Sequence, residues 1–148
     1  MEIKTGFSPG DQCKKIIMDA IRSAQDQIDI CVFTISDNQI SSLIKDAFNQ
    51  GLGVRIISDN DKMLDLGSDI KDLANAGIEA KIDKTQYHMH HKFMIIDHKA
   101  VLTGSYNWTR SAEEYNEENV VLIHHEPTAK QFEVEFDRLW EQCEYVVD

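Results

Sequence analysis

The sequence predicts an α/β domain with a mixed, largely parallel β-sheet flanked by helices. Two observations carry this prediction. Short runs rich in β-branched residues alternate with longer segments of helical periodicity over the first half of the chain, and shorter apolar runs separated by turn residues follow in the second half. The 148 residues match the length of one ordinary domain, and no linker, repeat or low-complexity tract divides them. A single domain over residues 1–148 is therefore expected.

The individual elements follow from residue spacing. Strands are expected at 2–7, 28–33, 54–58 and 78–82, with helices between them at 11–25, 38–50 and 62–76, the last interrupted by Gly67. Such alternation is typical of parallel strands joined by crossover helices. After residue 82 the rhythm changes, because the apolar runs 93–96 and 100–102 are separated only by Asp97, His98 and Lys99, which predicts a tight hairpin. A strand at 119–123 and an amphipathic helix at 129–142 complete the domain.

Charge is distributed unevenly along the chain. The formal net charge is -11, but residues 81–110 carry five Lys/Arg against two acidic residues, while the remainder carries ten against twenty-four. A cationic segment in an otherwise acidic chain indicates a site for an anionic group such as phosphate.

The cationic segment contains a dense set of chemically active residues, HMHHKFMIIDHKAVLTGSYNWT at 88–109. In strand geometry His90 and Lys92 point to the same side, where two basic groups would favour an anion between them. The predicted hairpin returns the chain so that Ser105 and Asn107 approach the His90 end. A hydroxyl and a carboxamide can both bond phosphate oxygens, and Gly104 allows the backbone to approach closely. The segment therefore predicts phosphate chemistry.

The pattern His-x-Lys-x4-Asp-x6-Gly-Ser-x-Asn resembles the signature of the phospholipase D superfamily. The start of the chain at 6–9, the strand–helix alternation and Asn-Glu-Glu-Asn at 116–119 are similar to the small single-motif bacterial endonucleases of that superfamily and to its mitochondrial relatives. The resemblance implies cleavage of phosphodiesters through a covalent phosphohistidine, without a metal ion or other cofactor.

The resemblance also implies a role for each matching residue. His90 corresponds to the nucleophile. Phosphate oxygens would be bound by Lys92, Ser105 and Asn107. Asp97 matches the motif aspartate, which supports the geometry of the site, and Glu118 matches the acidic residue that hydrogen-bonds the nucleophilic imidazole, with Glu117 as the alternative if the register differs by one.

The family's reaction needs two histidines on opposite sides of the phosphorus atom, one to attack and one to protonate the leaving oxygen. No second His-x-Lys occurs in the chain. The sequence therefore predicts a homodimer in which two identical motifs face each other across one site.

Other interpretations remain for several of these residues. His88, His90 and His91 could bind a metal, although Lys92 beside them opposes a cation. Tyr87, Tyr106 and Trp108 could stack on bases or belong to the core or a dimer interface. The favoured function is a nuclease acting on DNA or RNA. A cardiolipin-type phospholipid phosphodiesterase is the alternative, and a non-catalytic nucleic-acid-binding module is less favoured because it would not need a nucleophile.

The sequence also bears on the compartment. No signal peptide and no transmembrane segment are visible, which predicts a cytoplasmic protein, or an exported one if a leader has been removed. Cys13, Cys31 and Cys143 are odd in number and far apart, so free thiols are expected.

Overall fold

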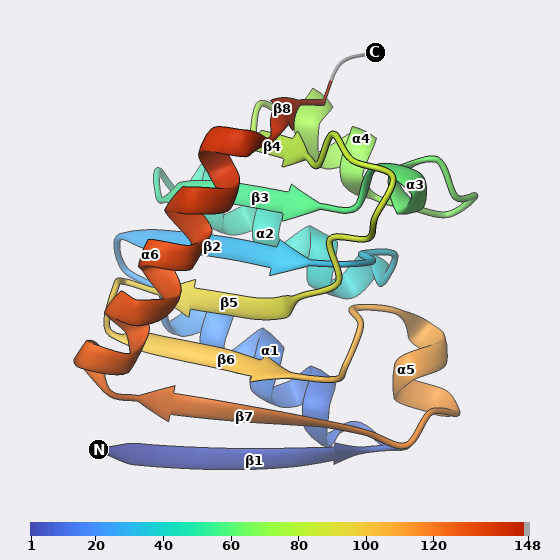
Figure 1. Cartoon of the computed structure of the whole chain (residues 1–148). Helices are drawn as coiled ribbons and strands as arrows, with labels where there is room; N and C mark the ends of the chain where they lie inside the picture. The colour runs from blue at the N-terminus through green and yellow to red at the C-terminus, as the bar shows by residue number, and fades with distance from the viewer. Residues whose placement is uncertain (147–148) are drawn as a thin grey trace.

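Eight strands form one sheet in the computed structural model, which describes residues 1–146 (Figure 1). The last two residues of the predicted domain 1–148 lie outside the described part of the chain. In spatial order the strands are β1 (Glu2–Ser8), β7 (Glu118–His124), β6 (Ala100–Gly104), β5 (Lys92–Ile96), β2 (Gln27–Val32), β3 (Gly53–Ser58), β4 (Glu79–Ile82) and β8 (Glu144–Tyr145).

The parallel part of the sheet consists of β2, β3 and β4. Helix α2 (Asn38–Asn49) links β2 to β3, and the Asp37 side chain caps its first turn by accepting hydrogen bonds from Gln39 N and Ile40 N. Ile40 and Ile44 on this helix are fully buried. This unit confirms the predicted strand–helix–strand alternation.

The other half of the sheet is antiparallel. β5 pairs antiparallel with β2, and β6, β7 and β1 continue outward in the same manner, while β8 adds antiparallel to β4. The mixed sheet is confirmed, but the expectation that it is largely parallel is wrong, since only two of its seven pairings are parallel. The physical reason is that a tight hairpin, which joins β5 to β6, can connect only antiparallel neighbours.

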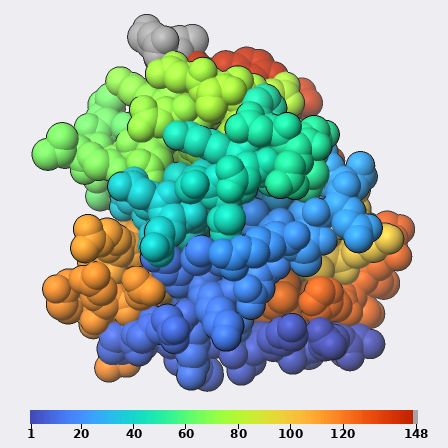
Figure 2. All heavy atoms as spheres, turned by 180° about the vertical axis from the view of Figure 1, so that it is seen from behind, coloured from blue at the N-terminus to red at the C-terminus, as the bar shows by residue number. Residues whose placement is uncertain are grey.

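Helices cover both faces of the sheet. α1 (Gln12–Ser23) and α2 lie on one face, seen from behind in Figure 2, and α6 (Glu126–Gln142) crosses the other (Figure 1). The strands alternate accordingly: Ile30 and Ile56 belong to the core under α1 and α2, and their neighbours Cys31 and Ile57 pack with Phe136 of α6. The three cysteines are free and buried, as expected.

Three short elements differ from the sequence prediction. The helix expected at 62–76 is two helices, α3 (Asn60–Met63) and α4 (Ile70–Asn75), separated by Gly67 at a φ of 90°. Helix α5 (Arg110–Glu114) was missed because five residues show too little periodicity, although Thr109 caps it by accepting from Ala112 N. The two-residue β8 was missed for the same reason.

Candidate active site

The predicted site residues gather at one rim of the sheet. β2 and β6 end where β5 and β7 begin, because Val32 pairs with Lys92 and Gly104 pairs with Val120. Lys92, Ser105 and Glu118 therefore lie at or next to strand ends on the same side of the molecule, right of the sheet in Figure 1. We call this the His90 rim.

His90 and Lys92 are in direct contact at this rim. Lys92 Nζ lies 2.8 Å from His90 Nδ1 and 3.4 Å from Nε2, and it donates a hydrogen bond to the His90 carbonyl oxygen at 2.8 Å. His90 is exposed, whereas Lys92 is half-buried. The predicted placement of these two groups on one side is confirmed.

The surroundings favour the uncharged form of both groups. Partial burial lowers the pKa of the His90 imidazole, and the nearby Lys92 and His88 lower it further. Burial also lowers the pKa of Lys92, with the negative charge of Glu118 acting in the opposite direction. A bound anion would relieve the unfavourable proximity of these basic groups.

Phe33, which the sequence analysis did not single out, packs against both His90 and Lys92. Its ring centroid lies 4.5 Å from that of His90, and Lys92 Nζ lies 5.3 Å from the same centroid. Phe33 N also donates to His91 O at 2.9 Å, which fastens the segment before β5 to the end of β2. Its position just after a buried strand was the available signal.

Asp59 is a second residue that sequence reasoning missed. It is fully buried after β3, and its Oδ1 accepts from Met89 N at 2.9 Å. Met89 points into the core, so its neighbours His88 and His90 are turned outward. His88 Nδ1 also lies 3.5 Å from Asp59 Oδ1. Asp59 therefore fixes the backbone that presents His90.

The second strand of the hairpin brings Ser105 to the rim. Ser105 N donates to Asn119 O, and Ser105 Oγ accepts from Asn119 N, both at 3.1 Å. Gly104 makes this approach possible, because a Cβ there would overlap Asn119 O and lie 2.9 Å from Val120 Cα. Asn107 Oδ1 is buried and has no hydrogen-bond partner within residues 1–146.

Glu118 is half-buried at the start of β7 and contacts Asn116 Nδ2 at 3.5 Å. Its expected hydrogen bond to His90 is not formed among the described residues of this chain, where Lys92 contacts the ring instead. Glu117 is exposed to solvent.

Asp97, expected to support the geometry of the site, lies at the opposite end of β5 from the His90 rim and makes no direct contact with it among residues 1–146. The five-residue strand between it and His90 spans about 16 Å at ~3.3 Å per residue. Asp97 accepts hydrogen bonds from the backbone N–H groups of Gln25, Asp26 and Gln27, at 2.8 to 3.3 Å. Burial raises the pKa of its carboxyl, but these donors outweigh burial and hold the pKa below its usual range. Asp97 joins the hairpin to β2.

The structure also bears on the two other interpretations, that aromatic residues stack on bases and that the histidines bind a metal. Tyr106 and Trp108 are buried core residues, so they cannot stack on bases, whereas Tyr87 is exposed. His91 Nε2 faces Glu135 of α6 at 3.5 Å, so His88, His90 and His91 do not form one set of metal ligands.

A mixed sheet thus presents a histidine–lysine pair and a Gly-Ser-x-Asn turn at one rim, side chains that are able to bind phosphate oxygens. The model of the family described as "Cardiolipin synthase, PLD-like domain" matches residues 17–140, and the chain belongs to this phospholipase D-like family.

Several known proteins are similar to this chain. A mitochondrial cardiolipin hydrolase of Chlamydomonas reinhardtii is 47% identical over 124 residues, which cover 84% of this chain and 56% of the relative. The human mitochondrial cardiolipin hydrolase is 35% identical over 137 residues, covering 93% and 54%. The crystal structure of the phospholipase D family member Nuc from Salmonella typhimurium superposes with a TM-score of 0.95 at 27% identity and covers 99% of both chains.

Length separates these relatives. The chain spans about half the length of the curated relatives it matches, but the whole of Nuc. Within residues 1–146, no helix is both long and apolar enough to cross a membrane.

Proposed function

We propose that the chain is a metal-independent phosphodiesterase in which His90 attacks phosphorus. The observation that carries the proposal is the exposed His90 imidazole, held 2.8 Å from Lys92 Nζ at a rim that also presents Ser105 and Asn107. A neutral imidazole is a competent nucleophile, and the lowered pKa of His90, caused by burial and then by Lys92, keeps the ring neutral to lower pH.

Lys92 has two roles in this proposal. It binds the phosphate anion of the substrate, and before substrate binds it contacts the His90 ring. An ammonium only donates, so the Nδ1 that contacts it must accept, and the ring proton then sits on Nε2. When a phosphate oxygen draws Lys92 away, the ring can adopt the tautomer with its proton on Nδ1, and this N–H donates a hydrogen bond to a carboxylate, for which Glu118 is our candidate. Nε2 is then free to attack. Ser105 and Asn107 donate to the non-bridging oxygens.

The reaction needs a second imidazole. As the N–P bond forms and the P–O bond breaks, the leaving oxygen takes a proton from that group. Water then cleaves the N–P bond and returns its proton to the same imidazole. His88 lies 6.3 Å from His90 between ring centroids but contacts the buried Asp59, so we assign the role to His90 of a second copy of the chain.

The exposed apolar side chains support a homodimer that covers the His90 rim. Of the nine large apolar side chains that are exposed among residues 1–146, five belong to this set: Phe7, Leu64, Leu66, Tyr87 and Tyr115. They lie at the end of β1, between α3 and α4, just before His88 and just after α5, and these connections all emerge at this rim (Figure 1). Water-exposed apolar groups concentrated around a reactive residue are typical of a surface that another chain or a ligand covers.

We infer that the substrate is DNA or RNA. Two features favour this: the end-to-end match to Nuc, and the exposed Tyr87 three residues before His90, where a base could stack. The mitochondrial cardiolipin hydrolases, at up to 47% identity, favour cardiolipin as the second candidate. Both substrates present a phosphodiester to the same rim.

The test is a side-by-side assay of single-stranded DNA, double-stranded DNA, RNA and cardiolipin vesicles in EDTA. We expect cleavage of a nucleic acid, its loss in His90→Ala, and its retention in the matched variant His91→Ala, whose ring faces α6. Cleavage of cardiolipin alone would overturn the nucleic-acid assignment. Activity that EDTA abolishes, or that survives in His90→Ala, would overturn the phosphohistidine mechanism.

A further inference from the structure

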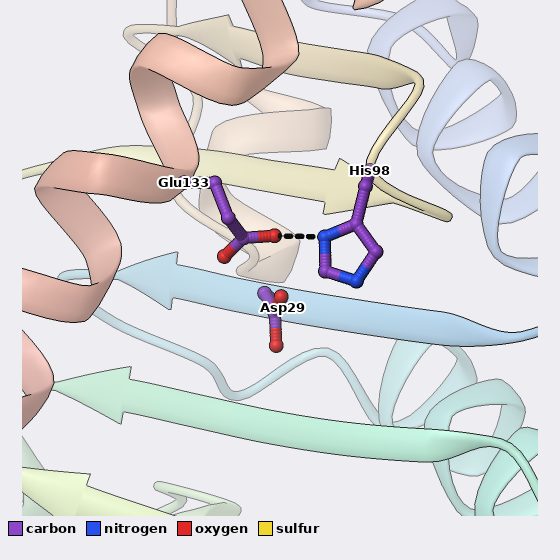
Figure 3. Close-up of side chains that lie close together, drawn as sticks. All are labelled: Asp29, His98 and Glu133. Carbon is purple, nitrogen blue, oxygen red and sulfur yellow. Dashed lines mark hydrogen bonds and ion pairs between the residues drawn. The ribbon is translucent and has the colours of Figure 1, made fainter.

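A second cluster of ligand-type side chains lies on the α6 face, far from the His90 rim. Asp29 comes from β2, His98 from the β5–β6 turn and Glu133 from α6, and Figure 3 shows the three side chains converging. One ligand atom from each lies within 4.8 Å of the others. His98 Nδ1 contacts Glu133 Oε1 at 2.6 Å.

Asp29 is the unusual member of this cluster. It is completely buried, and its Oδ1 accepts from Gln27 Nε2 and Arg55 Nε, both at 2.9 Å. Its Oδ2 is also buried but has no hydrogen-bond partner among residues 1–146. Buried carboxylate oxygens are rarely left unpaired, since the lost hydration is expensive, so this atom requires either a proton on the neighbouring Glu133 or a cation.

The charges around Asp29 are predominantly negative, which also favours a cation. Three carboxylates, Asp29, Glu133 and Asp137, surround one guanidinium, Arg55. Arg55 stacks over Phe136 with 4.7 Å between its Cζ and the ring centroid, which fixes its position. With all three carboxylates ionised, these four side chains sum to a formal charge of about -2, which a divalent cation would neutralise.

We propose that Asp29 Oδ2, Glu133 Oε1 and His98 Nδ1 bind a divalent first-row transition ion, with Zn²⁺ as the best fit. Two carboxylates and one imidazole are donors that Zn²⁺ accepts, and solvent can complete its coordination. Mg²⁺ fits less well because it prefers oxygen ligands only.

The three ligand atoms, which now lie within 4.8 Å of one another, must come to the common spacing that one ion requires. Ligands of a tetrahedral Zn²⁺ with bonds of about 2.0–2.1 Å lie about 3.3 Å apart, so His98 Nδ1 and Glu133 Oε1 must separate by about 0.7 Å from their present contact. The His98 side chain is about half exposed, at 48%, and can move outward. Burial, with Asp29 beside it, raises the pKa of the Glu133 carboxyl, so a proton competes with the ion for this site.

An ion here would join three elements that are distant in sequence. It would connect the hairpin turn to β2 and α6, next to the residue Asp97 that already binds the turn to β2. Because β5 separates this turn from His90, the ion would stabilise the fold and take no part in phosphodiester cleavage. Stability, rather than activity, is therefore the informative measurement.

The experiment is calorimetric titration of Zn²⁺ into the EDTA-stripped, dialysed full chain, combined with thermal unfolding. We expect one ion per chain, a Tm several degrees higher with Zn²⁺, and no comparable effect of Mg²⁺. His98→Gln should weaken binding by about tenfold or more and remove the Tm increase, and Glu133→Gln should do the same. The matched control is His91→Gln, which removes another exposed histidine paired with α6.

Other results would overturn the assignment. The site is wrong if Zn²⁺ produces neither binding heat nor a Tm shift, because the carboxyl pair then holds only its proton. It is equally wrong if binding survives His98→Gln and disappears in His88→Gln, since the ion would then lie at the His90 rim. Circular dichroism of each variant distinguishes loss of the ion from loss of the fold.

Discussion

Lys92 Nζ lies 2.8 Å from His90 Nδ1 and 2.8 Å from the His90 carbonyl oxygen. One ammonium group therefore contacts both the ring and the backbone of the residue two positions earlier. In the proposed mechanism His90 must be neutral to attack, and this contact places a positive charge against its ring. The other charges at the rim also shift the pKa of His90 and so affect the fraction of its ring that is neutral.

The first prediction concerns pH dependence. Burial, Lys92 and then His88 lower the pKa of His90, so the neutral ring persists to lower pH than in an isolated imidazole. His88→Gln removes one positive neighbour and should raise that pKa, moving the acidic limb of the profile of kcat/KM against pH to higher pH. The control is His124→Gln at the far end of β7. An acidic limb that stays in place in His88→Gln would contradict this account.

The second prediction tests the shared site by mixing subunits. If each site needs a His90 from both chains, a dimer of one wild-type and one His90→Ala chain is inactive. After equal amounts of the two proteins are unfolded and refolded together, activity per wild-type chain should fall to about half, as random pairing in a C2 dimer requires. A monomer by light scattering, or unchanged activity per wild-type chain, would show that the site lies within one chain.

The third prediction concerns Gly104. A methyl group at this position would overlap Asn119 O in β7, so Gly104→Ala should lower the free energy of unfolding by about 1–3 kcal/mol through overpacking. Urea denaturation measures the change. Gly10→Ala is the matched control, because Gly10 also has a positive φ but its Cβ would meet nothing within 4 Å. Equal losses in both variants would mean that backbone conformation, and not the contact, is responsible.

The fourth prediction concerns Asp97. Its folded pKa is depressed, so its contribution to stability is complete above the unfolded value of about 3.9 and is lost as pH falls through the folded value. Asp97→Ala should destabilise the protein by about 1–3 kcal/mol at neutral pH, and the difference from wild type should shrink in acid. Urea titrations at several pH values check this, with the exposed Asp46→Ala as control. A loss of stability independent of pH would exclude the charge as the cause.

Much of the fold could be predicted because the apolar periodicity is strong. The helices that carry Ile17 and Ile44 and the strands that carry Ile30 and Ile56 lie within a few residues of their expected bounds. Strand direction was harder, since β5 could have been parallel or antiparallel to β2 with the same residues in its core. The direction depends on where the chain enters β5. Because β4 runs parallel to β3 and β2 and ends at the His90 rim, the chain enters β5 from that rim and runs antiparallel to β2.

The site was predicted in part. The spacing of His90, Lys92, Gly104 and Ser105 sufficed to place them together, because strand geometry and a hairpin determine their positions. Phe33 and Asp59 were missed because they reach the rim from other strands and contribute a ring face and hydrogen bonds to the backbone. A motif read along one segment carries no information about such neighbours.

Because Asp97 lies at the far end of β5, one short motif contains residues with two separate tasks. His90 belongs to the reactive rim, and Asp97 attaches the hairpin to the chain at the start of β2. Under the proposed mechanism, substitution of the imidazole should remove the chemistry at every temperature. Substitution of the carboxylate leaves the reactive groups in place and loosens the frame that presents them, so the defect should emerge only on warming. Genetic screens would then recover position 97 among temperature-sensitive alleles and position 90 among complete nulls.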